Sequence, residues 1–490
     1  MSASQTTSST TVAQMFGRDA AYMMLWAVQL LGAALCTPLI TRALGLAEFG
    51  AVTTANAVMQ VLFIVAGLGL QPAVQRAYAG MGGPAAARRL VTVVLAAAAG
   101  VSALAWISLS WWSGPLTMAG QRDVLRLAVV WAGLSAATAA TLALLRSQDR
   151  LAAFAVVSLL QSIVAEVVSL GLVQLRNGGA ADFLAGQVAA QTVALLLGLF
   201  LVRPLPIGGR DRPLVADALR FALPLVPSIL STFVLSTSDR FIVEASLGSD
   251  AVARYQVAYN VAAMPMLLLS VLSAAWMPRF FRLSDVGERR VVLAASRDAL
   301  YRLLIPVMVG FAAATPLVLR LWAPPSYRPE TLQLVACLVL ATTVPFAAQL
   351  AVTRALMAAG HTRAIAAANI AAAAANIAGN LLLVPVWGLA GSALATLGAY
   401  LLLHAVLATA ARSSQVAGPL PGLRAGLAAA TAVTVLFAVV PQTGLVLAAR
   451  GVLTLAAIGW FLHQLTEISN PGRSGRLLAR LTGADDRGSR

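Results

Sequence analysis

The stretch RRLVTVVLAAAAGVSALAWISLSW, residues 88–111, decides the fold class of this chain. After Arg88 and Arg89, residues 90–111 carry no charged side chain. A helix needs roughly 20 apolar residues to cross about 30 Å of hydrocarbon, so this run predicts a transmembrane helix. The arginine pair in front of it predicts the end that stays in the cytoplasm.

The composition extends this prediction to the whole chain. The 490 residues are 59% hydrophobic and 11% charged, and the mean hydropathy is +0.83. Because soluble domains carry about 25% charged residues, we predict a bilayer protein without a sizeable soluble domain. This excludes a nucleic-acid-binding protein despite the net charge of +16. It also argues against an enzyme with a separate catalytic domain.

Apolar runs repeat along the chain. Six runs precede a polar stretch, six follow it and two weaker runs come last, which predicts an all-α membrane protein with about 14 transmembrane helices. The runs cover approximately residues 20–41, 50–71, 90–111, 124–145, 151–173, 183–202, 219–243, 255–277, 301–322, 331–353, 364–386, 390–411, 425–440 and 444–463.

This pattern predicts the organisation of the chain. The predicted segments are a disordered cytoplasmic tail (1–13), an N-terminal six-helix bundle (14–202), a cytoplasmic linker (203–217), a C-terminal six-helix bundle (218–411), an additional helix pair (412–463) and a basic cytoplasmic tail (464–490). The Ser/Thr-rich start lacks the basic region that opens a signal peptide.

Arginine sets the predicted orientation, because all 34 basic residues are arginine. Most of them lie on alternate connections, including Arg88 and Arg89, residues 203–220 and the C-terminal tail. Positive charge is retained on the cytoplasmic side of a membrane, so both termini are predicted to be cytoplasmic.

No catalytic, metal or cofactor motif accompanies the helices. Cys36 and Cys337 lie in apolar runs, and His361, His404 and His463 are scattered at loops and helix ends. We therefore predict no enzymatic activity, no metal and no cofactor. A membrane polysaccharide polymerase or ligase stays an alternative, although it would need a long external loop bearing acids or histidines.

Polar residues at membrane depth are the candidate functional residues, because burying them costs free energy unless they meet a partner or a wet cavity. Glu166 is the deepest acid, and Asp239 and Arg240 lie near the end of the seventh run. The other candidates are Arg42, Asn56, Gln60, Arg76, Arg279, Asn369, Asn376 and Asn380. The three asparagines of the eleventh run share one helix face. Hydrogen bonds between helices, and arginines that reach head groups, are the alternative explanations.

Several segments resemble a known family. Residues 37–50, TPLITRALGLAEFG, resemble the first-helix signature of O-antigen-type polysaccharide flippases in the multidrug/oligosaccharidyl-lipid/polysaccharide exporter superfamily. The segments that agree with it are 67–76, LPLVP at 223–227, SDRF at 238–241, LG at 247–248, YQVAY at 255–259, NLLLVP at 380–385 and GLAGSALAT at 388–396. The resemblance spans about residues 14 to 411.

The resemblance implies two six-helix bundles that face each other across a central cavity. It also implies alternating access, in which a polyprenyl-diphosphate-linked oligosaccharide moves from the inner to the outer leaflet of the bacterial cytoplasmic membrane. The implied partners are that lipid-linked oligosaccharide, membrane lipids, and a polysaccharide polymerase with its chain-length machinery. Nucleic acid is not among the expected partners. A multidrug exporter of the same superfamily is the alternative, and it would predict a more aromatic cavity.

A diphosphate linker suggests roles for these residues, because the guanidinium group gives a permanent charge and bidentate hydrogen bonds. Arg42, Arg76, Arg240 and Arg279 are the predicted diphosphate ligands. Asn56, Gln60, Asn369, Asn376 and Asn380 are predicted to bind sugar or neighbouring helices. Glu166 or Asp239 is predicted to carry a coupling ion.

Overall fold

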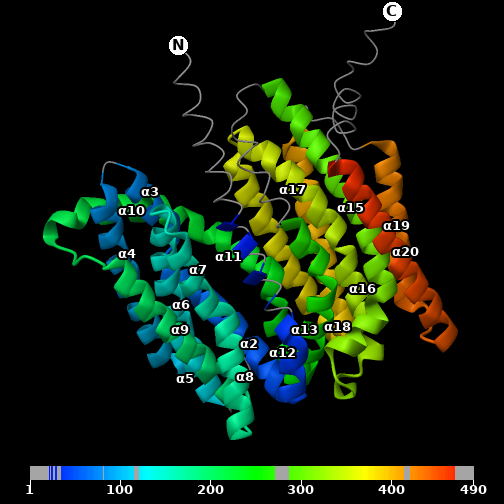
Figure 1. The fold of residues 1–490 in the computed structure, drawn as a ribbon, viewed down its shortest axis with the longest axis horizontal. Coiled ribbons are helices and arrows are strands. Elements are labelled where there is room, and N and C mark those ends of the chain that lie inside the picture. Colours follow the sequence, from blue (N-terminus) through cyan, green and yellow to red (C-terminus); the bar gives the residue numbers. More distant parts are fainter. Residues whose placement is uncertain are drawn as a thin grey trace, which may run out of the picture. The chain divides into compact units, whose positions relative to one another are not determined.

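The structure is a computed structural model that describes residues 21–469, apart from 23, 26–27, 30–31, 33–34, 81, 115–120, 271–285 and 413–419. These residues form helices and no strand (Figure 1), which confirms the predicted all-α class. The predicted tail at 1–13 lies outside the described residues. Of the predicted tail at 464–490, residues 464–469 continue the last helix and the rest lies outside the described residues.

The chain forms two compact units. The first holds the chain up to Phe233 together with Arg240–Ala253, and the second holds Val234–Asp239 and the chain from Arg254 onward. A helical segment at residues 35–43 precedes the labelled helices of the first unit. These are α2 (Leu46–Gly67), α3 (Gln71–Ala79), α4 (Gly83–Ile107), α5 (Leu109–Trp112), α6 (Arg122–Ser147), α7 (Leu151–Leu159), the π-helix η2 (Leu160–Val164), α8 (Ala165–Arg176), α9 (Ala180–Val202), η3 (Gly209–Asp211), α10 (Arg212–Ala222) and η4 (Leu223–Leu225).

Three helices contain the boundaries between the units, and the remaining helices belong to the second unit. The first group is α11 (Val226–Thr237), α12 (Asp239–Leu247) and α13 (Ser249–Ala262). The second group is α15 (Val286–Trp322), η5 (Pro325–Tyr327), η6 (Pro329–Leu332), α16 (Gln333–Ala341), α17 (Thr343–Ala358), α18 (Thr362–Ala410), α19 (Pro421–Val439) and α20 (Gly444–Ser469).

Eleven helical stretches among the described residues are long and apolar enough to cross a membrane. One of them, Thr362–Ala410, contains both the eleventh and the twelfth predicted helix. The predicted helices at 20–41 and 255–277 include residues outside the described set. The observed spans are therefore consistent with the prediction of about 14 crossings.

Gly388 divides α18 into a hairpin. Its backbone is non-helical at φ 56° and ψ −135°, three residues after Pro385. Across this turn, the amide of Asn376 donates to the hydroxyl of Thr396 at 3.3 Å. In a continuous helix these two residues, 20 positions apart, would be separated by about 30 Å. A Cβ atom at Gly391 would overlap the carbonyl oxygen of Leu383, so this close turn requires glycine.

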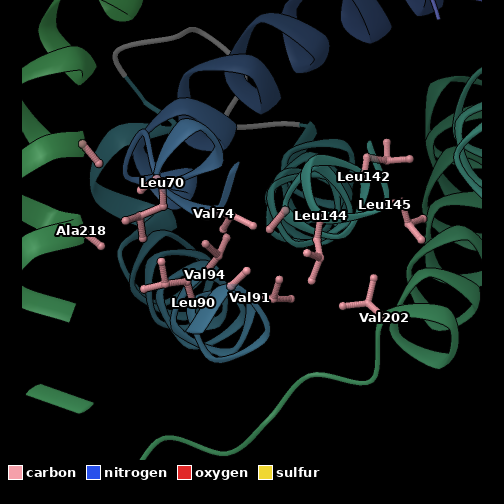
Figure 2. Close-up of a cluster of buried hydrophobic side chains, with 14 of the residues drawn as sticks. Leu70, Val74, Leu90, Val91, Val94, Leu142, Leu144, Leu145, Val202 and Ala218 are labelled. Atoms are coloured by element: carbon pink, nitrogen blue, oxygen red, sulfur yellow. The ribbon is translucent and has the colours of Figure 1, made fainter. Parts of the chain in front are cut away.

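The first unit has a core of aliphatic side chains (Figure 2). Leu70, Val74, Leu90, Val91 and Leu144 are fully buried, and they bring α3, α4 and α6 together. Small residues permit the closest approach, as where Ala66, Ala98 and Ala136 join α2, α4 and α6. Lipid offers no hydrophobic drive between helices, so this close packing holds the unit together.

The helix α15 begins earlier than its apolar run. The sequence predicts a membrane helix from about residue 301, but α15 is continuous from Val286. Arg297 and Asp298 lie in this extension, and both are buried and ion-paired at 2.8 Å. Their charges compensate each other, which makes burial of this polar turn tolerable.

The two final helices pack into the second unit. Leu427 and Ala430 of α19 join a buried cluster with Leu300, Leu304 and Met308 of α15. The sequence leaves open whether this pair serves packing or partner contact, and the structure shows a packing role.

Candidate functional site

Two of the predicted arginine ligands lie at exposed helix ends of the first unit. Arg42 is exposed, and its Nη1 donates to the carbonyl of Pro38 at 2.8 Å. Arg76 is 57% exposed, lies 3.7 Å from a carboxylate oxygen of Asp217 and stacks 4.8 Å from the ring centre of Phe221. An exposed ion pair of this kind contributes about 0–1 kcal/mol, so exchanging Asp217 for another anion would cost little.

Arg240 has the opposite surroundings. It is 4% exposed, and the preceding Asp239 is 1% exposed. The hydroxyl of Tyr255 donates to Asp239 at 2.6 Å. Two adjacent, opposite charges are thus buried at the start of α12.

Glu244, one turn further along α12, joins elements of the first unit. It accepts hydrogen bonds from the hydroxyl of Thr54 at 3.1 Å and from Ser249 at 2.6 Å. Because Thr54 lies on α2 and Ser249 opens α13, this buried carboxylate fixes the turn around Gly248.

Asn376 and Asn380 meet in a buried polar cluster of the second unit. Asn380 donates to the carbonyl of Asn376 at 2.9 Å, and the hydroxyl of Ser238 reaches the side-chain oxygen of Asn376 at 3.4 Å. Ser238 occupies the break between α11 and α12, and the side-chain oxygens of Asn380 and Ser392 are buried without a hydrogen-bond partner. Asn376 therefore bonds to other segments, and the cluster keeps unpaired acceptors.

Glu166 belongs to a second polar cluster, inside the first unit. It follows the π-helix η2, and Gln187 of α9 donates to its carboxylate. The second carboxylate oxygen is buried without a partner. Nearby, the amide of Gln191 donates to Thr138 at 2.8 Å and lies 3.4 Å from Gln161. A π-helix often marks a functional site, and here it lies directly before the turn that carries Glu166.

The remaining predicted residues are more scattered. Asn56 and Gln60 are partly exposed on α2, and Asn369 is partly exposed two turns before Asn376. Arg279 lies outside the described residues. The structure thus brings together Asn376 and Asn380, whereas Arg42 and Arg76 lie on separate helices.

Arg450 is the main polar residue that the sequence analysis missed. It is 1% exposed on α20, and its Nη2 donates to the carbonyls of Phe437 at 3.0 Å and Val440 at 3.3 Å. Gln333 of α16 donates to the same two carbonyls. The sequence signal for this residue is a lone arginine within an apolar run. Residue spacing cannot predict that its partners are carbonyls at the end of α19.

Within the described ranges, no group of three His, Cys, Asp or Glu residues is placed to hold a metal ion. Cys36 and Cys337 are free thiols.

Comparison with known proteins identifies the family. The sequence profile of a family described as polysaccharide biosynthesis protein matches residues 39–324, which is more than half of the chain. Among curated proteins, none matches the sequence.

Solved structures share the fold. The lipid II flippase MurJ in its inward closed conformation gives a TM-score of 0.67 at 12% identity, covering 92% of this chain and 98% of MurJ. An inward-facing multidrug resistance MATE transporter of the MOP superfamily gives 0.61 at 13% identity, covering 83% and 95%. An outward-facing MATE transporter gives 0.53 at 14% identity, covering 85% and 96%. The chain is a multi-pass membrane protein that shares the fold of these structures, and it belongs to the polysaccharide biosynthesis protein family.

Proposed function

We propose that this protein flips a polyprenyl-diphosphate-linked oligosaccharide from the inner to the outer leaflet of the bacterial cytoplasmic membrane, for an envelope or exported polysaccharide. The observation that carries the proposal is the family match over residues 39–324, which includes Arg42, Arg76 and Arg240. In this proposal both termini are cytoplasmic, and a polymerase with chain-length machinery receives the product.

The chemistry of the cargo explains why a protein is needed. A sugar head group that enters bare hydrocarbon forfeits its hydrogen bonds to water, so a polar route must replace them. The lipid tail needs no such route and can stay in the bilayer. Alternating access around one binding site supplies the route without opening a continuous pore.

The polar residues divide between the parts of this cargo. Arg42, Arg76 and Arg240 bind the diphosphate, because guanidinium groups pair with phosphate oxygens in bidentate geometry. Asn56, Gln60 and Asn369, which are partly exposed, bind sugar hydroxyls. Asn376 and Asn380 hold helices together in the cluster that Ser238 joins.

Deletion of the gene tests the direction of transport. The expected result is accumulation of lipid-linked repeat units on the inner leaflet, and export restored by a plasmid copy. Accumulation on the outer leaflet would instead identify a polymerase or ligase. Unchanged glycan export, together with new sensitivity to cationic drugs, would favour the multidrug alternative that the MATE-like fold keeps open.

Coupling to an ion gradient gives a separate prediction for Glu166. We expect Glu166→Gln to lower gradient-driven transport roughly tenfold, because the amide keeps the hydrogen bond to Gln187 but cannot exchange a proton and carries no negative charge to attract a cation. The measurement is transport into vesicles with an imposed proton or sodium gradient. Asp123→Asn is the control, because Asp123 is 80% exposed and pairs only with Arg126 among the described residues. Transport that ignores both gradients, or is unchanged by Glu166→Gln, would contradict this role.

A further inference from the structure

An apolar cavity of about 450 Å³ lies inside the first unit, lined by α2, α4, α5 and α12. From α2 it takes Val58, Val61, Leu62 and Val65, a stripe at helical spacing. Phe241 at the start of α12 completes the wall. The volume falls within the range of small-molecule sites, roughly 300–1,000 Å³.

The cavity has an apolar mouth. Leu104 lines the cavity and is 69% exposed, and Ile107, one turn further along α4, is 79% exposed. An apolar surface of this kind on a membrane-spanning helix contacts hydrocarbon. A lipid chain can therefore enter the cavity from the bilayer without leaving an apolar environment.

The polar groups of the lining are already satisfied. The indole nitrogen of Trp112 donates to the carbonyl of Ala105 at 3.1 Å, and the hydroxyl of Ser108 donates to the carbonyl of Leu104 at 2.7 Å. These bonds leave no donor directed at a ligand, so the cavity fits a hydrocarbon and not a sugar or a drug with polar groups.

The neighbouring charge indicates which hydrocarbon. Phe241 directly follows Arg240, which is 4% exposed and which the proposed function assigns to the diphosphate. A polyprenyl diphosphate carries its charged group on the first carbon of the chain, whereas a phospholipid places glycerol between phosphate and chain. Because the buried Arg240 precedes the lining residue Phe241 in the chain, the cavity suits the first arrangement.

We propose that this cavity binds the first isoprene units of the polyprenyl chain while Arg240 binds the diphosphate. The proposal rests on the proposed function and extends it, because it gives the protein a site for the lipid part of its cargo. Filling the cavity should then weaken binding of the whole lipid and leave recognition of the head group intact.

The test uses the purified full-length protein and measures binding of undecaprenyl diphosphate and of inorganic pyrophosphate. Ala105→Phe fills the cavity, because Ala105 lines it and is 7% exposed. We expect this variant to weaken undecaprenyl diphosphate binding roughly tenfold and to leave pyrophosphate binding unchanged. Ala103→Phe makes the same change at an exposed position of α4 that does not line the cavity, so it is the matched control and should bind both as the wild type does. If Ala105→Phe fails to fold, Val65→Phe fills the cavity from its half-exposed rim.

The outcomes separate the cavity from the proposed function. Wild-type affinity for undecaprenyl diphosphate in a folded, filled variant overturns the cavity proposal, and so does equal displacement of that lipid by phosphatidylglycerol. If Arg240→Ala loses undecaprenyl diphosphate binding while the filled variants keep it, the cavity site is overturned and the proposed function stands. A third outcome is that the wild-type protein binds undecaprenol, that the filled variants bind it more weakly, and that no variant binds pyrophosphate. This result would support the cavity and contradict the proposed function.

Discussion

Arg76→Ala is expected to lower flipping of the lipid-linked oligosaccharide roughly tenfold or more, because a charge-assisted hydrogen bond to phosphate is worth about 1.5–3 kcal/mol. The structural cost should be small, since Arg76 is 57% exposed and its pair with Asp217 spans 3.7 Å. The measurement is glycan export in a deletion strain that carries the variant, normalised to the amount of variant protein in the membrane.

Arg126→Ala is the matched control for this experiment. Arg126 is 47% exposed, pairs with Asp123 at 2.9 Å and stacks 5.6 Å from the ring centre of Trp106, so it repeats the contacts of Arg76. We expect this variant to export normally, because Arg126 is not assigned to the substrate. Normal export by Arg76→Ala, or an equal loss in both variants, would remove Arg76 from the proposed diphosphate ligands.

Arg450→Ala is expected to reduce the stability of the second unit by roughly 3 kcal/mol. The substitution removes hydrogen bonds to the carbonyls of Phe437 and Val440 and the stacking of the guanidinium 4.6 Å from the Phe437 ring centre. It also leaves a cavity beside Gln333, because the side chain is almost fully buried. The measurement is the thermal unfolding midpoint of the purified protein in detergent.

Arg424→Ala is the control for this prediction. Arg424 is exposed near the start of α19, so its removal should change stability by less than about 0.5 kcal/mol. Equal unfolding midpoints for Arg450→Ala and the wild type would show that the buried hydrogen bonds at the end of α19 contribute little.

The sequence predicts the helices well because their signal is local. Each crossing needs an uninterrupted apolar run. Gly45, Gly248 and Gly388 stand at the turns between helices, so the sequence itself marks where those helices end. The start of α15 is the clearest difference. There, a polar helical turn is buried because Arg297 and Asp298 neutralise each other, and hydropathy cannot register this pairing.

The candidate site is less predictable, because it depends on contacts between distant segments. Helical spacing alone places Asn376 and Asn380 on one face, and the structure shows them bonded. It cannot show that Ser238 reaches Asn376 across 138 positions, or that Gln333 and Arg450 share carbonyl partners. Nor can spacing distinguish Arg240, which is buried, from Arg42, which is exposed.

Reconstitution of the purified protein in liposomes tests the central claim most directly. The substrate is an undecaprenyl-diphosphate oligosaccharide with a fluorescent sugar, and a membrane-impermeant quencher reports the fraction of the label on the outer leaflet. We predict that the wild-type protein moves the labelled lipid between leaflets, and that Arg76→Ala slows this movement roughly tenfold or more while Arg126→Ala does not. Vesicles that leave the lipid-linked sugar in its original leaflet, yet export a cationic drug against its gradient, would contradict the account.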